Sequence, residues 1–547
     1  MFGWAGGLGL APVGCEPEKE RRPPSAPTSL DFPAHTSDTT GNEPESSLRE
    51  IGSILGSIKR PQDISAEKFK AFNLRVEHDI PASAIVRQDV PNSCPPLPWE
   101  DESLNPSPLA EDGSPILLEN GNPYPPKDRF EVLKDELLLD NDDAFREVGR
   151  LPPREGRQKV RVTQARKFWM GLERMSQYWD SSLDRYYERP ATPQGTPQAT
   201  DGEVQPPQNE SQTGTEMNLD EPPTNNDQKD GQAEFVTMYQ GRRIAAGHEM
   251  PEDIREETIR ALTEMAAWPF GCQVALPIMP PRLTLGTLLF PIRQTFEVAR
   301  SPKDRQLARS GVMEGPLFAA QCRPETSFRA PQEATGSGFG EVCDLFRELG
   351  SMLLAAQERL RQGATEVKPG EGKWWTMTPR WGGAFNDVVG DSGNFSHGDD
   401  RPTLDAGNVR KRSKYEHPFF APRRPNGSRR LSNAERWRLV QPGPSLWDRR
   451  MRYIQIGKSQ DSAFDDIYML SSINHHIAIL HLRVHHRYIE VLTTGDSDFP
   501  PDSDTADHPW HVLKMRRTKW YDLFDAQDRL EVFKGIWTIF HYMLRRP

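Results

Sequence analysis

Five of the thirteen histidines fall in a twelve-residue stretch near the C-terminal end, and imidazole is a common metal ligand and proton carrier near neutral pH. They are His475, His476, His481, His485 and His486. We expect the surrounding segment, 465–492, to be one long helix, on which successive residues turn by about 100°. Only His481 and His485 would then share a face, and two ligands do not complete a zinc site. The pattern favours histidines hydrogen-bonded in the core or at its margin over metal ligands or catalytic bases.

Two other motifs could bind a ligand, but structural roles explain them better. The string TGSGFGEV at 335–342 superficially matches the glycine-rich loop of a kinase, but no VAIK-type lysine, HRD or DFG follows it. We interpret it as a flexible loop that ends at a helix start. Trp374, Trp375 and Trp381 could form a floor for a sugar, a methylated lysine or a proline-rich peptide, but aromatic residues dominate ordinary cores. The sequence therefore predicts no cofactor and no metal.

The strongest local bias is a basic run between 401 and 430, where Glu416 is the only acid after Asp405. Bases at this density can act as a nuclear import signal or hold phosphates. The import signal would be bipartite, because two basic pairs are separated by ten residues. A solvated loop with neither role is the alternative. The candidate nuclear-targeting or phosphate-contacting residues are Arg410, Lys411, Arg412, Lys414, Arg423 and Arg424.

Ser432 combines two local signals. The string Arg429-Arg430-Leu431-Ser432 is the arrangement that basophilic kinases prefer, and Ser432 with Glu435 forms a helix capping box. Ser432 is therefore a phosphorylation candidate, with a purely structural cap as the alternative. A phosphate there would lie at a helix N-terminus beside two arginines, which both favour it. We predict that phosphorylation strengthens the helix and weakens import or phosphate binding.

The composition limits the size of the core and the class of protein. The 547 residues include 50 prolines and only 35% are hydrophobic, so we expect one folded unit with long disordered additions. A net charge of -11 argues against a generally basic, nucleic-acid-coating surface, although the basic run keeps nucleic acid as a candidate partner. Five widely spaced cysteines suggest neither a disulfide framework nor a zinc site. Because no apolar run could span a bilayer and no secretion signal is evident, we expect an intracellular protein without a membrane partner, in the nucleus in preference to the cytoplasm.

Start and stop signals predict the helices and strands of the folded part. Helices are expected over 48–58, 162–187, 251–268, 301–311, 342–360, 465–492 and 525–544. Short apolar runs bounded by Pro or Gly predict strands over 274–276, 288–290, 317–322 and 453–456. We therefore predict a mainly α fold, α+β with a minor sheet, as a single helix-dominated domain interrupted by long disordered segments.

The predicted organisation has six parts. A mostly disordered arm covers 1–125, and a helical segment over 126–189 docks on the core. An acidic disordered linker follows over 190–233. The core then has two parts, 234–390 and 432–547, on either side of a basic flexible loop over 391–431.

These observations favour a non-catalytic interaction or regulatory protein that presents a helical domain to protein partners and carries phosphorylatable disordered arms. One alternative is an enzyme of unfamiliar type, in which the histidine-rich helix 465–492 works with Asp465, Asp466 or Glu490. The other is a nucleic-acid-associated protein that binds through the basic loop 410–430. The partners and the oligomeric state are left open by the sequence.

Overall fold

A computed structural model describes twelve stretches of the chain. They are residues 17–35, 50–58, 63–86, 94–100, 108–110, 112–190, 235–276, 281–285, 288–364, 452–458, 462–495 and 509–546. The chain divides into two compact units. The first comprises Met1–Gly14, Thr28–Met175 and His248–Pro547, and the second comprises Cys15–Pro27 and Ser176–Gly247.

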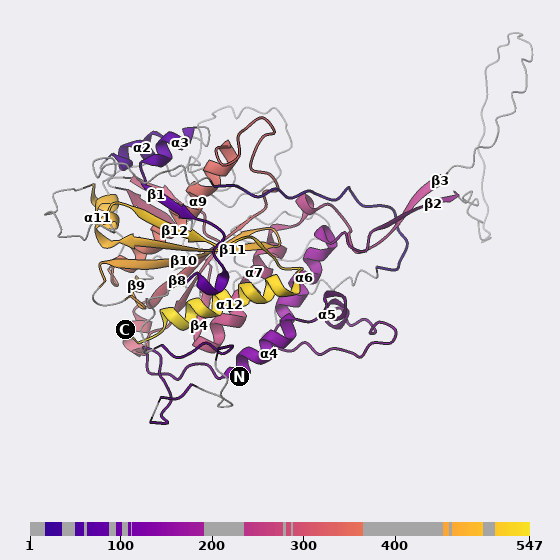
Figure 1. Cartoon of the computed structure of the whole chain (residues 1–547), viewed down its shortest axis with the longest axis horizontal. Coiled ribbons are helices and arrows are strands. Elements are labelled where there is room, and N and C mark those ends of the chain that lie inside the picture. Colours follow the sequence, from indigo (N-terminus) through magenta and orange to yellow (C-terminus); the bar gives the residue numbers. More distant parts are fainter. Residues whose placement is uncertain are drawn as a thin grey trace, which may run out of the picture. The chain divides into compact units, whose positions relative to one another are not determined.

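The first unit is built on a nine-stranded mixed sheet (Figure 1). In spatial order its main strands are β1 (Leu74–Glu77), β12 (Leu513–Arg517), β11 (His476–His485), β10 (Phe464–Ile473), β8 (Val312–Arg323), β7 (Phe296–Arg300) and β4 (Cys272–Ala275). In addition, β13 (Tyr521–Asp522) pairs with β11 and β9 (Arg452–Ile454) pairs with β8. The prediction of a mainly α, helix-dominated domain with a minor sheet is wrong, because 36% of the described residues are helical, 23% are in strands, and the main sheet is a large mixed one.

The largest error concerns 465–492, which is not one helix. The strands β10 and β11 pair along their whole length as an antiparallel hairpin, and only α11 (His486–Thr494) is helical. The turn of the hairpin contains Asn474, whose φ of 53° lies in the left-handed region that asparagine tolerates. Both faces of the two strands are buried, so apolar residues occur on both faces and the sequence lacks the alternation that marks a half-exposed strand. A buried helix gives the same pattern.

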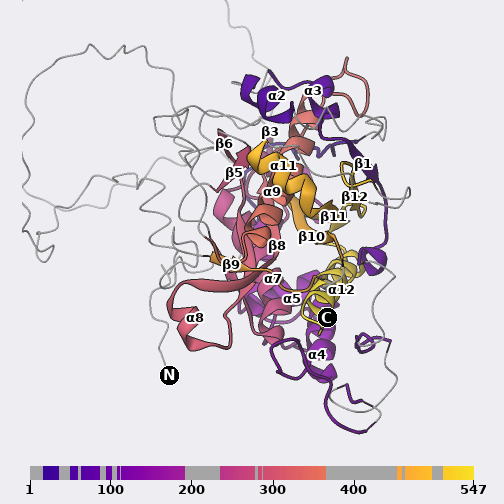
Figure 2. The same cartoon turned by 90° about the vertical axis from the view of Figure 1, so that its left-hand side faces the viewer.

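Helices cover both faces of this sheet. The helix α9 (Phe339–Leu360) packs against β8 and β10 on one face, and α12 (Ala526–Met543) with α7 (Glu252–Ala267) covers the other. The alternation of β11 shows the two layers, because Leu480 belongs to the core beneath α9, whereas Ile479 lies against Gly535 of α12. Figure 2 views the layers from the side.

The best predicted helices are those with strong local end signals. α7 begins after Pro251, α12 is capped by the side chain of Asp525, and α9 ends before Gly363, which has a positive φ. These three predictions are confirmed. The short α8 (Arg305–Arg309) is capped by Asp304, not by Ser301. The predicted helix over 162–187 is observed as α6 (Arg166–Trp179), and its last turns are replaced by a strand.

Smaller elements complete the first unit. They are the helices α2 (Ile51–Ser57), α3 (Ala66–Lys70), α4 (Lys127–Leu137) and α5 (Asn141–Val148) and the strand pair β5 (Arg282–Leu285) and β6 (Leu288–Pro291). Among the helices of the described stretches, none is both long and apolar enough to cross a membrane.

The second unit contains a separate two-stranded antiparallel ribbon. Its strands are β2 (Arg185–Pro190) and β3 (Phe235–Gln240), and they pair in register from Arg185 opposite Gln240 to Pro190 opposite Phe235. A bridge between Arg21 and Tyr239 adds the segment near Arg21 to the outer edge of β3. The acidic linker predicted beyond Pro190 and the basic loop predicted over 391–431 lie outside the described residues, as do Trp374, Trp375 and Trp381.

Candidate functional site

The site residues predicted from charge and kinase preference lie outside the described residues. This applies to the phosphorylation candidate Ser432 and to Arg410, Lys411, Arg412, Lys414, Arg423 and Arg424. Their roles in import, phosphate binding and regulation therefore stay predictions. The glycine string at 335–342 is described: its first half forms the loop that leads into α9, and its second half forms the first turn of that helix. The carboxylate of Glu341 accepts hydrogen bonds from the backbone N–H groups of Gly336 and Gly338, at 2.8 and 3.0 Å.

The five clustered histidines do not fan around one helix. Three of them have well-defined local partners. The His481 ring stacks on Tyr468 and its Nε2 lies 2.9 Å from Oδ1 of Asp466. His485 caps α11, because its Nδ1 accepts a hydrogen bond from the N–H of Arg487 at 3.1 Å. Nδ1 of His486 lies 3.0 Å from the carbonyl oxygen of residue 463. These contacts hold the hairpin and the start of α11 in place.

The other two histidines form a cluster with an acid that the sequence did not connect to them. His475 lies in the turn of the β10–β11 hairpin and His476 is the first residue of β11. Asp522 of β13 lies directly across the strand pair from His476, and its Oδ1 is 3.9 Å from Nε2 of His475. One nitrogen of each ring and one carboxylate oxygen all lie within 4.8 Å of one another. Two imidazoles and a carboxylate are therefore brought together at a half-buried position.

Burial affects the protonation of all three groups. It lowers the pKa of His475 well below its usual range and lowers the pKa of His476 to about 4. Burial, with the nearby carboxylates of Asp528 and Asp525, raises the pKa of Asp522 to about 6. Both imidazoles are therefore neutral at physiological pH, with a lone pair on one nitrogen of each ring.

A second titratable cluster lies between the sheet and the N-terminal half of α9. Its acids are Asp344 and Glu348 of α9, and its bases are Arg323 of β8 and Arg517 of β12. Arg323 binds both acids, and Arg517 donates to Glu348 at 3.2 Å. Two buried carboxylates and two buried guanidinium groups balance in charge, so the network contributes no net charge to the interior.

Two polar side chains complete this network. Ser471 of β10 donates its hydroxyl to Glu348 at 2.5 Å and accepts a hydrogen bond from Arg323. Nε2 of His35 lies 3.8 Å from Glu348, and burial together with Arg517 lowers the pKa of His35 well below its usual range. Burial alone would raise the pKa of Glu348, but the two arginines outweigh it and lower that pKa. The serine hydroxyl and the charged groups are thus bound to one another within the interior.

Glu297 of β7 and Glu358 of α9 form a third group of acids. Burial raises the pKa of Glu297 well above its usual range, and the neighbouring Glu358 raises it further. The pKa of Tyr453 in β9 is raised by burial and by the same two carboxyl groups. Paired carboxyl groups serve as catalysts where they face a substrate. Glu297 is fully buried, so we assign this group to the packing of α9 on the sheet.

The second unit has its own buried anchor. The guanidinium group of Arg243 binds Asp184, donating from Nε at 2.8 Å, and also donates to the Tyr186 hydroxyl at 2.9 Å and to the Ser25 carbonyl at 2.8 Å. Tyr239 donates its hydroxyl to the same aspartate at 2.7 Å. Arg243 is completely buried, so this arrangement fixes the base of the ribbon.

Apolar side chains are exposed along the rest of this unit. The exposed fractions are 50% for Tyr186 of β2, and 59% and 41% for Phe235 and Val236 of β3. Leu183 and Ile244, which flank the strands, are 39% and 47% exposed. Ten large hydrophobic residues of the described chain are exposed, and half of them belong to this small unit. The second unit is therefore a candidate binding surface.

Comparisons with protein-family models, with curated proteins and with solved structures found no match for this chain.

Proposed function

We propose that this chain is a non-catalytic interaction protein whose β2–β3 ribbon binds an extended segment of a protein partner. The observation that carries the proposal is the exposed apolar surface of the second unit. An isolated two-stranded ribbon is marginally stable in water, and Phe235 and Val236 remain exposed on it. Covering these side chains with a partner would remove apolar surface from water, which contributes roughly 25 cal/mol for each Å² buried.

The pairing of the strands supports an extended partner. Within the described part of the chain, β2 pairs only with β3, whose outer edge is partly taken by the bridge from Arg21. The outer edge of β2 therefore presents backbone N–H and C=O groups to which another strand can add. Side chains of the added strand would alternate between the two faces of the ribbon.

The two faces of β2 favour different side chains on the partner. Arg185 and Arg189 lie on one face and are both exposed, although Arg189 is already paired with Glu20 at 3.1 Å, and Val236 lies opposite Arg189. Tyr186 lies on the other face, which also carries Phe235 at the far end of the ribbon. We therefore expect the partner segment to alternate carboxylates with apolar or aromatic residues.

The chemistry of the interior supports a role without catalysis. The Ser471 hydroxyl is held between Glu348 and Arg323, and burial raises the pKa of the thiols of Cys272 and Cys322 to about 12. A thiol with such a pKa is protonated at neutral pH and is a poor nucleophile.

A displayed library of random peptides, selected on the full-length protein, tests the proposal. We expect enrichment of sequences in which Asp or Glu alternates with apolar residues. A synthetic peptide of that kind should bind at least about tenfold more weakly to Phe235→Asp and to Arg185→Glu, which corresponds to about 1.4 kcal/mol for each change. Both side chains are exposed, so these variants should melt like the parent.

Phe339→Asp is the matched control. Phe339 is 41% exposed but belongs to α9 in the first unit. Its replacement should leave peptide binding unchanged. Selection without an alternating pattern, or equal binding by the parent, Phe235→Asp and Arg185→Glu, would refute the assignment of the ribbon as the binding element.

A further inference from the structure

We propose that His475, His476 and Asp522 form a binding site for a divalent transition-metal ion of the zinc class. Two imidazole nitrogens and one carboxylate oxygen are ligands that Zn²⁺ and its neighbours in the first transition row accept readily, whereas Mg²⁺ and Ca²⁺ prefer oxygen ligands alone. Three protein ligands leave a fourth tetrahedral position for water.

The positions of the ligands suit such an ion. A tetrahedral zinc ion lies about 2.0–2.2 Å from each nitrogen or oxygen ligand, so its ligands are roughly 3.4 Å apart. The three ligand atoms here lie within 4.8 Å of one another, and the closest pair for which a contact is defined, His475 Nε2 and Asp522 Oδ1, is separated by 3.9 Å. The side chain of Asp522 is 37% exposed, and its Oδ1 also accepts a hydrogen bond from the N–H of Phe524 at 2.8 Å, which a carboxylate oxygen can keep while its second lone pair binds an ion.

The backbone holds the two histidines in place before any ion binds. The N–H of Asn474 donates to the carbonyl of Arg323 at 3.1 Å, and its side-chain amide donates to the carbonyl of Glu325 at 3.1 Å. The carbonyl of His475 accepts a hydrogen bond from the N–H of Leu523 at 3.0 Å. The turn that carries both histidines is thereby tied to the segment that carries Asp522, and ligands fixed in this way lose little entropy on binding an ion.

Aromatic rings surround the two imidazoles. The His475 ring lies against Phe524, with centroids 4.8 Å apart, and the His476 ring lies against Phe32 at the same separation. The Nδ1 atom of His476 is buried and has no hydrogen-bond partner among the described residues. A buried nitrogen without a partner costs free energy, and coordination of an ion would remove that cost.

The charged groups around Asp522 include both acids and bases. An imidazole nitrogen and a carboxylate oxygen bind a metal ion only in their unprotonated forms, so binding would release any proton that Asp522 carries. Asp528 accepts a hydrogen bond from the N–H of Asp522 at 3.1 Å and is also paired with Lys519, and Asp525 lies near enough to raise the pKa of Asp522. The guanidinium group of Arg529 also acts on Asp522, so the two neighbouring carboxylates are balanced by two bases.

A second cluster shows that the spacing of the ligand atoms alone does not make a metal site. His35, Asp344 and Glu348 also place their ligand atoms within 4.8 Å of one another. There, Arg323 binds both carboxylates and Arg517 binds Glu348. These arginines would repel a metal ion and would lose their partners if the ion bound. Asp522, the acid beside His475 and His476, is not bound by any arginine among the described residues. The cluster at the hairpin turn is therefore the one that favours a metal ion.

Metal titration of the full-length chain tests this inference independently of the ribbon. The protein is first treated with a chelator and then titrated with Co²⁺, whose visible absorption reports tetrahedral nitrogen and oxygen coordination, and with Zn²⁺ in a calorimeter. We expect one equivalent of each ion to bind in the same place, with zinc displacing cobalt. Zinc should also raise the melting temperature, because it binds the folded state.

Asp522→Asn and His476→Ala are the test variants, and His248→Ala at an exposed histidine is the control. Loss of an outer hydrogen-bond partner already weakens metal sites by about 10- to 100-fold, so loss of a ligand should weaken binding by at least about 100-fold. Asp522→Asn keeps the size of the side chain, and melting without metal shows whether each variant is folded. Absence of stoichiometric binding, or equal binding by the parent and by folded Asp522→Asn and His476→Ala, would overturn the inference.

Discussion

His541 of α12 should make the protein sensitive to mild acid. Its side chain is almost completely buried, its Nε2 lies 2.8 Å from the carbonyl oxygen of Pro95, and its ring packs against Tyr124. Burial lowers its pKa from 6.5 to about 4, although the contact with the Pro95 carbonyl acts in the opposite direction. The unfolded chain takes up a proton near pH 6.5, whereas the folded protein does so only near pH 4. Stability is therefore lost as the pH falls through this window.

The size of the effect follows from the two pKa values. One pKa unit corresponds to 1.36 kcal/mol, so the full shift corresponds to about 3 kcal/mol. Between about pH 7.5 and about pH 5, where protonation of the unfolded state is nearly complete, the loss attributable to His541 is about 2 kcal/mol. Glutamine at this position is neutral throughout and can still donate to the Pro95 carbonyl. His541→Gln should therefore remove about 2 kcal/mol from the loss of stability between the two pH values.

Urea unfolding at the two pH values, followed by tryptophan fluorescence, measures this difference. His248→Gln at an exposed histidine is the control and should lose as much stability as the parent. If His541→Gln loses as much stability on acidification as the parent protein, His541 is not a source of the acid sensitivity and the reasoning from burial is wrong.

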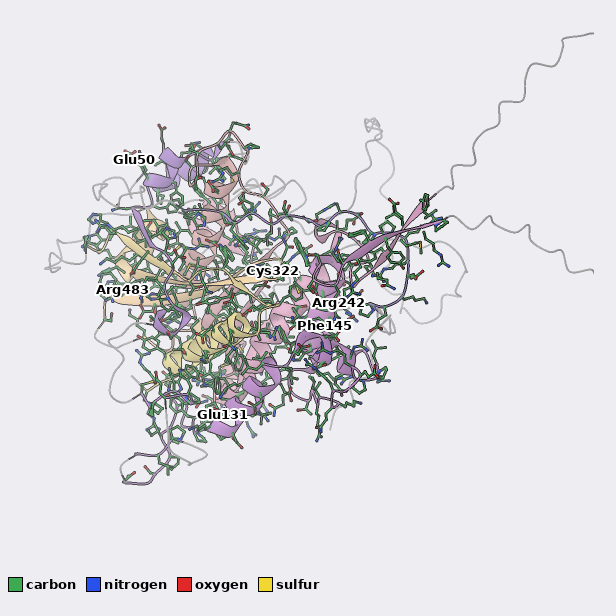
Figure 3. All side chains as sticks on the ribbon, turned by 45° about the vertical axis from the view of Figure 1, so that its right-hand side comes forward. Glu50, Glu131, Phe145, Arg242, Cys322 and Arg483 are labelled. Atoms are coloured by element: carbon green, nitrogen blue, oxygen red, sulfur yellow. The ribbon has the colours of Figure 1, made fainter. Side chains whose placement is uncertain are left out.

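Three further changes test other parts of the interior. Arg359 binds both carboxylate oxygens of buried Asp465, at 2.7 and 2.9 Å, so Arg359→Met should cost about 3–5 kcal/mol in urea unfolding, and a loss below 1 kcal/mol would contradict this. A Cβ atom on Gly535 would lie 2.4 Å from Cδ1 of Ile479, so Gly535→Val should lower stability by about 1–3 kcal/mol, and an unchanged melting temperature would show that α12 can move away. Burial raises the pKa of three thiols to about 12, so iodoacetamide should label them only after denaturation, and rapid labelling of the native protein would show that they are accessible. These thiols belong to Cys272, Cys322 (Figure 3) and Cys343.

The sequence predicts those elements whose ends carry local signals. Pro251 and Asp525 mark the starts of α7 and α12 because a helix N-terminus needs a cap or tolerates proline, and neighbouring residues supply both. The hairpin of β10 and β11 lacks such a signal. Its two strands are covered by α9 on one face and by α12 on the other. The sequence of the strands does not show that these distant helices pack on them. A largely apolar sequence without strict alternation therefore resembles that of a buried helix.

Only part of the candidate metal site could be recognised from the sequence. His475 and His476 stand out as neighbours, but the angles of a helix do not apply to a turn followed by a strand. Asp522 comes 46 residues after His476 and becomes its neighbour only through the pairing of β13 with β11. The one available signal was the short spacing between Asp522 and the cap at Asp525, which places Asp522 just before α12. The exposed ribbon was missed because Leu183 and Tyr186 continue the helical spacing of α6 although the chain leaves the helix at Trp179.

The parallel pairing of β1 with β12 has a consequence for synthesis of the chain. Glu77 of β1 and Arg516 of β12 are partners in register and in an ion pair, yet they are separated by 439 residues. At ribosomal rates of about 5–20 residues per second, β1 waits roughly 20 to 90 seconds for its partner to be made. During that time the apolar side chains of Leu74 and Val76 have no strand beside them. The nascent chain thus offers a chaperone an early strand, and the sheet closes at this edge only when the last hundred or so residues, in which β11, β12 and α12 lie, are being completed.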